Sequence, residues 1–389
     1  RSVTATDRLG APVNVFNGGL LSVASASSTQ QYIESEAFNA GLNVARDFHW
    51  GVPITLKTGV LLNRQARDRT GNSSSWTFNP PGGTAGRLAA NFDLLDRDNS
   101  ERWYFTDVTG ARVQPQWLSP ARLFAIYQAN PSWFTLNEAA EHTNRVNNTT
   151  RLTETITAGY LRADGRFLAN RLWIATGVRY ERTDDEGAGP LNDIWGVYVR
   201  RPDGSLARDS AGRLIPVTTN AAERARLQYR LLGSSRKTDY DGFYPSFNSS
   251  FDVTPNLVAR AAYARTIGRP NLNLIIPNTT IADPDAAESG RTITVSNGNL
   301  APWTADNYDL TLEAYYVKGA VASVSLFRKD IRDFHAASRA DATPQLLEEF
   351  GLPDEFLDYD IVTQRNAGSA SLSGFELGYR QSLTFLPAW

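Results

Sequence analysis

Hydrophobic and polar residues alternate strictly along residues 308–316 of the chain. The even positions are Tyr308, Leu310, Leu312, Ala314 and Tyr316, and the odd positions are Asp309, Thr311, Glu313 and Tyr315. A repeat of two residues is that of a β-strand, in which successive side chains point to opposite sides. The pattern therefore predicts a strand with one apolar face and one polar face. It leaves open whether the apolar face contacts lipid or a protein core.

The same alternation recurs in about nine to eleven segments, many of them near the ten residues that a tilted membrane strand needs. Clear examples are residues 52–62, 168–181, 243–253 and 374–383. Aromatic residues stand near the ends of the predicted apolar faces, where the aromatic girdle of a membrane barrel would lie, although aromatics favour any β-strand. They are Tyr160, Tyr180, Phe243, Tyr263, Tyr308, Tyr316 and Tyr379.

The connections between these segments alternate between short and long. Short turns, rich in Gly, Pro, Asn or Asp, are predicted at 48–53, 162–166, 252–256 and 317–320. Long loops are predicted at 69–150, 184–241, 269–306 and 335–362, the last with a helical segment at 343–360. Because every second connection is long, all long loops should emerge at one end of the sheet. This layout is typical of an outer-membrane barrel, whereas such loops count against a compact soluble domain.

Composition and charge exclude several classes of function. Of the 389 residues 41% are hydrophobic, and no stretch approaches the roughly 18 consecutive apolar residues of a transmembrane helix. The 39 Lys and Arg residues balance the 41 Asp and Glu residues, so nothing points to nucleic acid as a partner. The chain starts at Arg1 and contains no methionine, and we expect it to be an internal piece of a longer protein.

The residue types that carry metal or nucleophilic chemistry are scarce. The chain has no cysteine, and its three histidines, His49, His142 and His335, lack metal-ligand spacing. No acid pair, Ser-His-Asp set or phosphate-binding glycine loop stands out. We therefore expect no metal site, no cofactor and no enzymatic activity.

Several motifs in the second half of the chain resemble the barrel of TonB-dependent outer-membrane receptors. The resemblance is strongest over residues 240–385, moderate over 150–182 and weak over 1–150. It rests on five consecutive elements. The first is a strand that ends in an Arg-Pro step, and the second is an Asn-Leu-Pro element that precedes the next strand. The third and fourth are that next strand and the strand that pairs with it after a turn, and the fifth is a stretch containing Asn, Gly and Glu. The residues that carry it are Tyr263, Arg265, Arg269 and Pro270; Asn299, Leu300 and Pro302; Tyr308, Asp309, Leu312, Glu313 and Tyr316; Phe327, Lys329, Asp330 and Ile331; and Asn366, Gly374 and Glu376.

The resemblance implies an all-β fold, an antiparallel transmembrane barrel of about 22 strands closed around a plug. Residues 1–389 would form a partial barrel, with the plug domain and the C-terminal strands absent from this chain. It also implies a location in the outer membrane of a Gram-negative bacterium and uptake of a scarce nutrient such as an oligosaccharide or metal chelate. The implied partners are outer-membrane lipid, the small nutrient, and the inner-membrane TonB complex, which acts through the plug.

The polar face of each predicted strand should line the barrel lumen, because a charge facing lipid costs about 2–4 kcal/mol at mid-bilayer. The lumen-facing or plug-contacting candidates are Arg171, Arg179, Glu181, Asp309, Glu313, Glu376 and Arg380. Charges of opposite sign on neighbouring strands can also pair with each other.

Aromatic residues of the long loops are the candidates for ligand capture. Exposed rings stack on sugars and flat chelates and often anchor a ligand, although they also pack loops against each other. The first long loop holds Trp76, Trp103, Tyr104, Trp117, Tyr127, Trp133 and Phe134, and the second holds Trp195 and Tyr198.

Two other functional classes fit the same strands. A passive porin would have the strands without a plug, and a soluble all-β binding protein would bury the apolar faces in a shared core. Outward-facing Leu310, Leu312 and Tyr316 would exclude the soluble protein.

Overall fold

The computed structural model describes residues 5–6, 8–13, 18, 21–97, 105–106, 112–113 and 116–383. The chain divides into two compact units. The first comprises Arg1–Gln31, Gly71–Arg145 and Thr218–Arg226, and the second comprises Tyr32–Thr70, Val146–Val217 and Leu227–Trp389.

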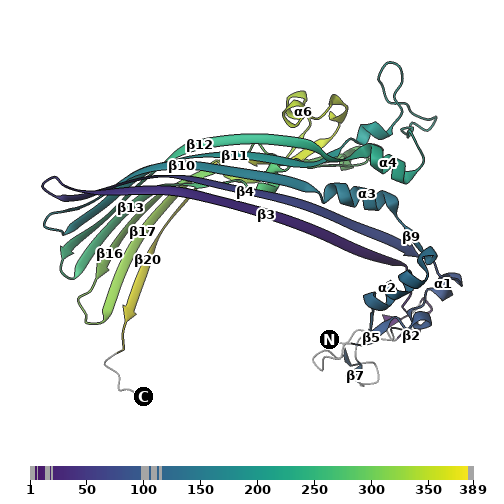
Figure 1. The fold of residues 1–389 in the computed structure, drawn as a ribbon, viewed down its shortest axis with the longest axis horizontal. Coiled ribbons are helices and arrows are strands. Elements are labelled where there is room, and N and C mark those ends of the chain that lie inside the picture. The colour runs from purple at the N-terminus through teal and green to yellow at the C-terminus, as the bar shows by residue number, and fades with distance from the viewer. Residues whose placement is uncertain are drawn as a thin grey trace. The chain divides into compact units, whose positions relative to one another are not determined.

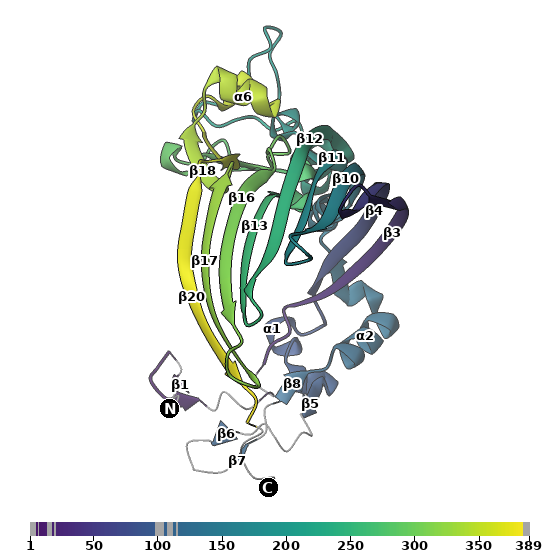
Figure 2. The same ribbon diagram turned by 90° about the vertical axis from the view of Figure 1, so that its left-hand side faces the viewer.

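The main sheet consists of long antiparallel strands that lie side by side in chain order, most of it within the second unit (Figure 2). These strands are β3 (Ser25–His49), β4 (Pro53–Phe78), β10 (Thr150–Phe167), β11 (Leu172–Asn192), β12 (Tyr229–Thr254), β13 (Leu257–Gly268), β16 (Trp303–Ala314), β17 (Ala320–Arg332) and β20 (Ala370–Gln381). The short strand β9 (Phe134–Leu136) adds to β4. Among the described residues β3 and β20 do not pair with each other, so the sheet is an open part of a barrel wall.

Short turns and long connections alternate as predicted. The turns after β3, β12 and β16 coincide with the predictions at 48–53, 252–256 and 317–320. The turn predicted at 162–166 is wrong, because these residues continue β10, and the chain reverses at 168–171 instead. Leu168, Ala169 and Asn170 all have positive φ there, so Asn170 rather than Gly165 marks the turn.

Several strands extend far beyond the length that a membrane requires. β4 and β12 each have 26 residues, roughly 86 Å at 3.3 Å per residue, against about 30 Å of hydrocarbon. Parts of the loops predicted at 69–150 and 184–241 are therefore strand, and the connections shorten to 79–149 and 193–228. The polar residues on both faces of these extensions concealed them, since alternation is the signal for a half-buried strand.

The register places the predicted apolar residues on one face. Leu310 of β16 lies opposite Leu326 of β17, which lies opposite Phe375 of β20. Tyr180 lies opposite Phe243 in the same way. Tyr160 is an exception among the predicted girdle residues, because it lies opposite Arg179, on the other face. Its hydroxyl donates to Asn43 Oδ1 at 2.9 Å.

The long connections of the second unit fold into a small domain with its own core. Its sheet has the order β14 (Thr279–Ile281), β15 (Thr292–Val295), β19 (Asp360–Asn366) and β18 (His335–Asp341). Short helical segments complete it: η4 (Ile194–Val197), η5 (Glu288–Gly290), α6 (Pro344–Phe350) and η6 (Asp354–Phe356). A further short helix, α5 (Leu272–Ile275), contacts β11 and β12 of the main sheet. α6 and η6 confirm the helix predicted at 343–360, divided near Pro353. Ile293, Leu347 and Ile361 are each at most 1% exposed at the centre of this core.

The first unit consists of short strands and helical segments around the ends of β3 and β4 (Figure 1). Its elements include β1 (Ala5–Thr6), β2 (Pro12–Val13), α1 (Gly83–Gly86), η2 (Ala89–Phe92), β5 (Leu95–Arg97), β6 (Phe105–Thr106), β7 (Arg112–Val113), β8 (Gln116–Leu118), α2 (Pro120–Ala129) and η3 (Pro131–Trp133). α3 (Glu138–Asn147) and α4 (Ala221–Gln228) begin in this unit and end in the second. Its core gathers around Phe78, which is fully buried at the end of β4.

Candidate functional site

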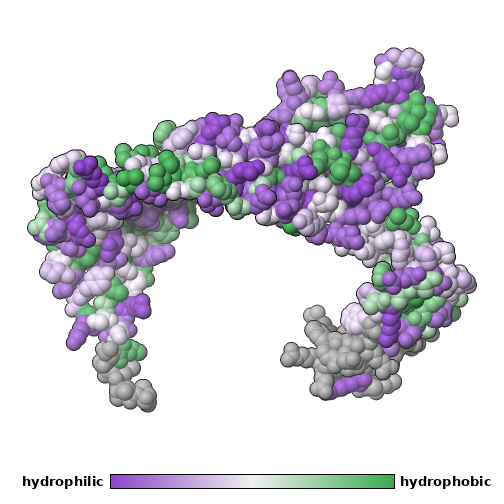
Figure 3. All heavy atoms as spheres, viewed as in Figure 1, coloured by the Kyte–Doolittle hydropathy of each residue, from purple (hydrophilic) through white to green (hydrophobic). Residues whose placement is uncertain are grey.

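One face of the strands exposes large apolar side chains in a continuous band. Leu310 is 53% exposed, Leu326 51% and Leu377 72%, and each has apolar neighbours on the adjacent strand. Hydrophobic residues also gather over the halves of β3 and β4 next to their connecting turn (Figure 3). An apolar surface of this extent requires an apolar environment.

Aromatic pairs followed by charges mark one edge of the apolar band. The rings of Tyr180 and Phe243 lie 5.1 Å apart, as do those of Tyr263 and Tyr308. One strand step beyond Tyr180 on the same face, Arg182 forms an ion pair with Asp184 at 2.9 Å. Amphipathic rings prefer the boundary between hydrocarbon and water, so this edge is where the bilayer would end.

The opposite face carries most of the charges that the sequence assigned to the lumen. Arg179 forms an ion pair with Glu181, which also binds Arg269. Glu313 pairs with Arg260 at 3.2 Å. These charges therefore pair with neighbouring charges on the same face, which was the alternative to contact with a plug.

The remaining predicted lumen residues divide into two groups. Asp309, Glu376 and Arg380 are exposed on the polar face and make no side-chain hydrogen bond or ion pair within the described chain. Arg171 departs from the prediction because it lies in the turn before β11. Its guanidinium packs over the Phe251 ring, 5.3 Å from the centroid, and donates to the Asp252 carbonyl at 3.0 Å.

A buried pair of acids on the polar face was not foreseen. Glu154 of β10 lies opposite Asp185 of β11, and the two residues are 8% and 3% exposed. Both carboxylate oxygens of Asp185 lack a hydrogen-bond partner among the described residues. Burial of an unpaired carboxylate is costly, so a buried pair of acids favours either a basic partner or protonation of one of the acids.

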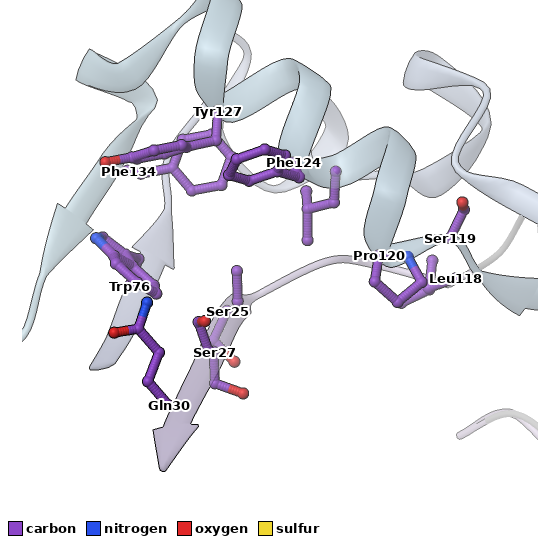
Figure 4. Close-up of a pocket in the computed structure, with 13 residues that line it drawn as sticks. Ser25, Ser27, Gln30, Trp76, Leu118, Ser119, Pro120, Phe124, Tyr127 and Phe134 are labelled. Atoms are coloured by element: carbon purple, nitrogen blue, oxygen red, sulfur yellow. The ribbon is translucent and has the colours of Figure 1, made fainter. Parts of the chain in front are cut away.

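The first unit holds a pocket of about 450 Å³, within the size range of small-molecule sites. The start of β3, the end of β4 and helix α2 form its walls (Figure 4). We refer to it as the aromatic pocket, because the rings of Trp76, Phe124, Tyr127 and Phe134 line it. In Figure 4 the rings of Tyr127 and Phe134 lie across the pocket from Ser25 and Ser27.

The strand pairing of β4 and β9 positions two of these rings. Trp76 lies opposite Leu136, and Phe78 lies opposite Phe134. Because Trp76 and Phe78 are two residues apart, they point to the same side of β4. Phe78 contacts Phe134 with 4.9 Å between ring centroids, and the packed pair supports the pocket from behind.

Helix α2 supplies the other rings. Pro120, Leu123, Phe124 and Tyr127 follow the spacing i, i+3, i+4 and i+7, which places them on one face. Ser119 caps the helix by accepting the Arg122 N–H at 3.4 Å. Tyr127 lies 5.9 Å from Trp76 and 5.3 Å from Phe134, measured between centroids.

The pocket combines rings with small uncharged polar groups. Its remaining walls include the side chains of Ser25, Ser27, Ser28 and Gln30 from β3. Within the described chain, Ser25, Ser27 and Gln30 make no side-chain hydrogen bond, and neither does the Trp76 indole. None of the lining residues is Asp, Glu, Lys, Arg or His.

The aromatic candidates from the first long loop occupy different positions. Trp76 and Phe134 line the aromatic pocket, whereas Trp133 packs against Phe92 behind it, at 5.9 Å. Trp117 is 59% exposed on β8, next to the pocket residue Leu118. Trp103 and Tyr104 lie outside the described residues.

The two candidates from the second long loop belong to the core of the second unit. Trp195 is 8% exposed and packs against Phe356 at 5.1 Å, and Tyr198 packs against the same core. Both residues therefore pack loop segments against each other, which was the alternative to ligand capture. Phe124 was not among the candidates, but the helical spacing of "PARLFAIYQA" would have identified the face on which it lies together with Tyr127.

A second pocket, of about 340 Å³, lies in the second unit and has a different chemistry. It is lined by Arg67 and Arg69 of β4 together with Asn273, Asn278 and other polar residues. The loop that contains α5 presses against β11 here: a Cβ on Gly187 would lie 2.8 Å from the Ile275 carbonyl oxygen. We refer to it as the polar pocket.

No group of three or more His, Cys, Asp or Glu side chains among the described residues is arranged to hold a metal ion. No helix in the described ranges is long and apolar enough to cross a bilayer.

A wall of antiparallel strands with an exposed apolar band, a polar opposite face and long connections at one end defines an outer-membrane β-barrel protein. The family model described as "TonB dependent receptor-like, beta-barrel" matches residues 3–389. The chain therefore belongs to the TonB-dependent receptor-like β-barrel family, whose location is the outer membrane of Gram-negative bacteria.

Solved structures with a similar arrangement include three outer-membrane receptors. The ferric-catecholate import receptor Fiu from E. coli K12 has 12% identity and a TM-score of 0.42, over 91% of this chain and 36% of that receptor. The ferric citrate transporter FecA has 12% identity and a TM-score of 0.44, over 93% and 34%. The siderophore receptor PiuA from Acinetobacter baumannii has 13% identity and a TM-score of 0.42, over 91% and 37%. The chain thus spans about a third of their length, and no curated protein matches it.

Proposed function

We propose that this chain forms part of the wall of an outer-membrane receptor that takes up a scarce nutrient, an oligosaccharide or a metal chelate, at the expense of energy. In this proposal, residues 1–389 contribute a partial barrel, and a plug domain and further strands come from the rest of the receptor. The inner-membrane TonB complex drives uptake through the plug.

The observation that carries the proposal is the division of the strands into an exposed apolar face and a charged face. A soluble protein of this size would bury Leu310, Leu326 and Leu377 in a core, whereas lipid accepts them. The membership of the chain in a receptor family supports transport rather than enzymatic turnover.

The charged face supports a plugged lumen rather than an empty one. Both carboxyl oxygens of Asp185 are buried without a hydrogen-bond partner among the described residues. Asp309, Glu376 and Arg380 are exposed charged residues without an ion pair there. In the proposed receptor, basic and acidic groups of the plug pair with these residues. A passive porin would leave the buried Asp185 without such a partner, whereas the three exposed residues would be solvated in either case.

An uptake assay in the native host tests the proposal. Cells that carry or lack the gene are given radiolabelled neutral oligosaccharides and ferric chelates, with and without a protonophore. We expect gene-dependent uptake of one ligand class, abolished when the proton gradient collapses. Gene-dependent uptake that persists without the gradient would instead identify a passive channel.

A fractionation experiment tests the membrane assignment independently. We expect the receptor in the outer-membrane fraction, resistant to extraction by carbonate or high salt. Recovery of the chain in the soluble fraction would refute the barrel and leave a soluble binding protein.

A further inference from the structure

We propose that the aromatic pocket binds an uncharged carbohydrate, with one sugar ring lying against Trp76 and its hydroxyl groups bonded to the serines and the glutamine of β3. This inference rests on the proposed function, because it names the class of nutrient that the receptor would capture. It selects between the oligosaccharide and the metal chelate.

The absence of charge in the pocket argues against an anionic ligand. Metal chelates with catecholate or carboxylate donors, and haem with its carboxylates, bring negative charge that a site must compensate with Arg, Lys or helix termini. The walls of the aromatic pocket contain none of the five ionisable side chains Asp, Glu, Lys, Arg and His. Arg122 is the nearest cation in the sequence of α2, but it contacts the carbonyl groups of Asp93 and Leu95, at 2.6 and 3.0 Å.

The polar groups argue against a purely apolar ligand. A lipid or hydrocarbon would cover the hydroxyls of Ser25 and Ser27 and the amide of Gln30 without offering them a hydrogen bond. Each group left unpaired in this way would lose its hydrogen bonds to water without gaining others, which disfavours binding. The same groups match a ligand that has many hydroxyls and no charge.

The aromatic rings supply the other half of carbohydrate recognition. A pyranose ring has an apolar face of C–H groups that fits against an aromatic plane, while its edge carries hydroxyls. In Figure 4 the Trp76 ring lies next to the Gln30 side chain, and Tyr127 and Phe134 lie opposite. The pocket therefore offers a ring for the apolar face of the sugar and an amide for its edge in adjacent positions.

The polar pocket provides a contrast within the same chain. Two arginines and several asparagines line it, so an anionic ligand would find its partners there rather than at Trp76. The difference makes the proposal specific: neutral and anionic ligands should depend on different residues.

Calorimetric titration of the full receptor, purified in detergent, tests this proposal without requiring transport. The probes are neutral trisaccharides (maltotriose, cellotriose, xylotriose and mannotriose), anionic trigalacturonate and ferric citrate. We expect at least one neutral trisaccharide to bind, and Trp76→Ala to weaken that binding more than about tenfold, as expected for an aromatic anchor. Trp76→Phe, which retains a ring, should weaken it less than Trp76→Ala.

Two further variants separate recognition from folding. Gln30→Ala changes an exposed residue of β3 and should weaken sugar binding about fivefold through a lost hydrogen bond. Trp117→Ala is the matched control, because this tryptophan is exposed but does not line the pocket, and it should bind sugar like the parent receptor.

The proposal is overturned if no neutral trisaccharide binds, if only trigalacturonate or ferric citrate binds, or if sugar binding is unaffected by both Trp76→Ala and Gln30→Ala. A receptor that binds sugar in detergent but fails in the uptake assay would refute the energy-dependent transport and leave the sugar site standing.

Discussion

Two regions of β4 use the same alternation for opposite purposes. In the apolar band, Val60 and Leu62 project from one face of the strand and are 61% and 38% exposed. At the far end of the strand, Trp76 and Phe78 project together, but Phe78 is fully buried against η2 and β9. Val60 and Leu62 require lipid to cover them, whereas Phe78 is buried in a protein core and Trp76 lines a pocket.

The comparison shows that what covers an apolar face depends on the neighbouring elements. Along the band, the adjacent strands present the same kind of residue, so a wide surface stays exposed. Around Phe78, the chain returns after β4 to form η2, α2 and β9, which close over it. The two regions should therefore respond in opposite ways to substitutions.

Removal of the Phe78 ring should have the largest effect. Phe78→Ala leaves a cavity in the core behind the aromatic pocket, at a cost of about 3–5 kcal/mol. We expect loss of sugar binding and rapid proteolysis within residues 79–137, while the strands keep their resistance to SDS at room temperature. Phe124→Ala is the control for proteolysis, because this ring is 58% exposed and its removal leaves no cavity in the core. Equal proteolysis of both variants would contradict a core centred on Phe78.

A charge in the apolar band should disrupt the other region. Leu326 lies between Leu310 and Phe375, and Leu326→Arg should cost about 2–4 kcal/mol if this face contacts hydrocarbon. The expected result is reduced assembly in the outer membrane, measured as the fraction that resists SDS without heating.

The matched control places the same charge on the opposite face. Ser323 lies opposite Glu313 on the polar side of β17, so Ser323→Arg should assemble like the parent receptor. If Ser323→Arg were the more harmful of the two, the assignment of the faces would have to be reversed.

Removal of the α2 cap should have a smaller effect, limited to the pocket region. Ser119→Ala leaves the Arg122 N–H without its acceptor, at a cost of about 1 kcal/mol. Hydrogen exchange in the first turn of α2 should be about fivefold faster. Ser28→Ala is the control, because Ser28 lines the pocket without capping a helix. Unchanged exchange in Ser119→Ala would show that the cap does not hold α2.

Acidification should loosen α3 slightly. Ser74 and Asn72 donate hydrogen bonds to the Glu141 carboxylate at 2.6 and 3.2 Å, and these bonds lower the pKa of Glu141. Because the pKa of Glu141 is lower in the folded than in the unfolded chain, its carboxylate stabilises the fold at pH values above the unfolded pKa of about 4.3. This stabilisation is lost as the pH falls through the folded-state pKa. Protease protection of residues 138–145 should therefore decrease below about pH 4. Glu141→Gln should remove that pH dependence, and an unchanged profile would exclude the carboxylate as its cause.

Much of the sheet could be predicted because each strand carries its own signal. The alternation around Leu310 and Phe375 fixes two faces, and the turns near Pro255 and Gly319 fix the hairpins. One turn was predicted at the wrong position. The Asp-Gly pair at 164–165 is typical of a hairpin turn, but the chain turns at Asn170, a residue type that also tolerates positive φ.

The candidate site was predicted only in part, because loop aromatics carry no local sign of their surroundings. Trp76 and Trp195 look alike in the sequence, but one lines a pocket and the other is buried in a core. The helical spacing of α2 would have identified Phe124, on the same face as Tyr127. The pairing of Glu154 with Asp185 required the register of β10 and β11.

The sequence by itself determined which side chains share a face of each strand, because the β-repeat of two residues is a property of the local backbone. It also determined the alternation of short and long connections. Only the tertiary structure decided what each face contacts. Burial depends on which distant segments return to cover a residue, as α2 and β9 do for Trp76 and Phe78, and no local pattern records that return.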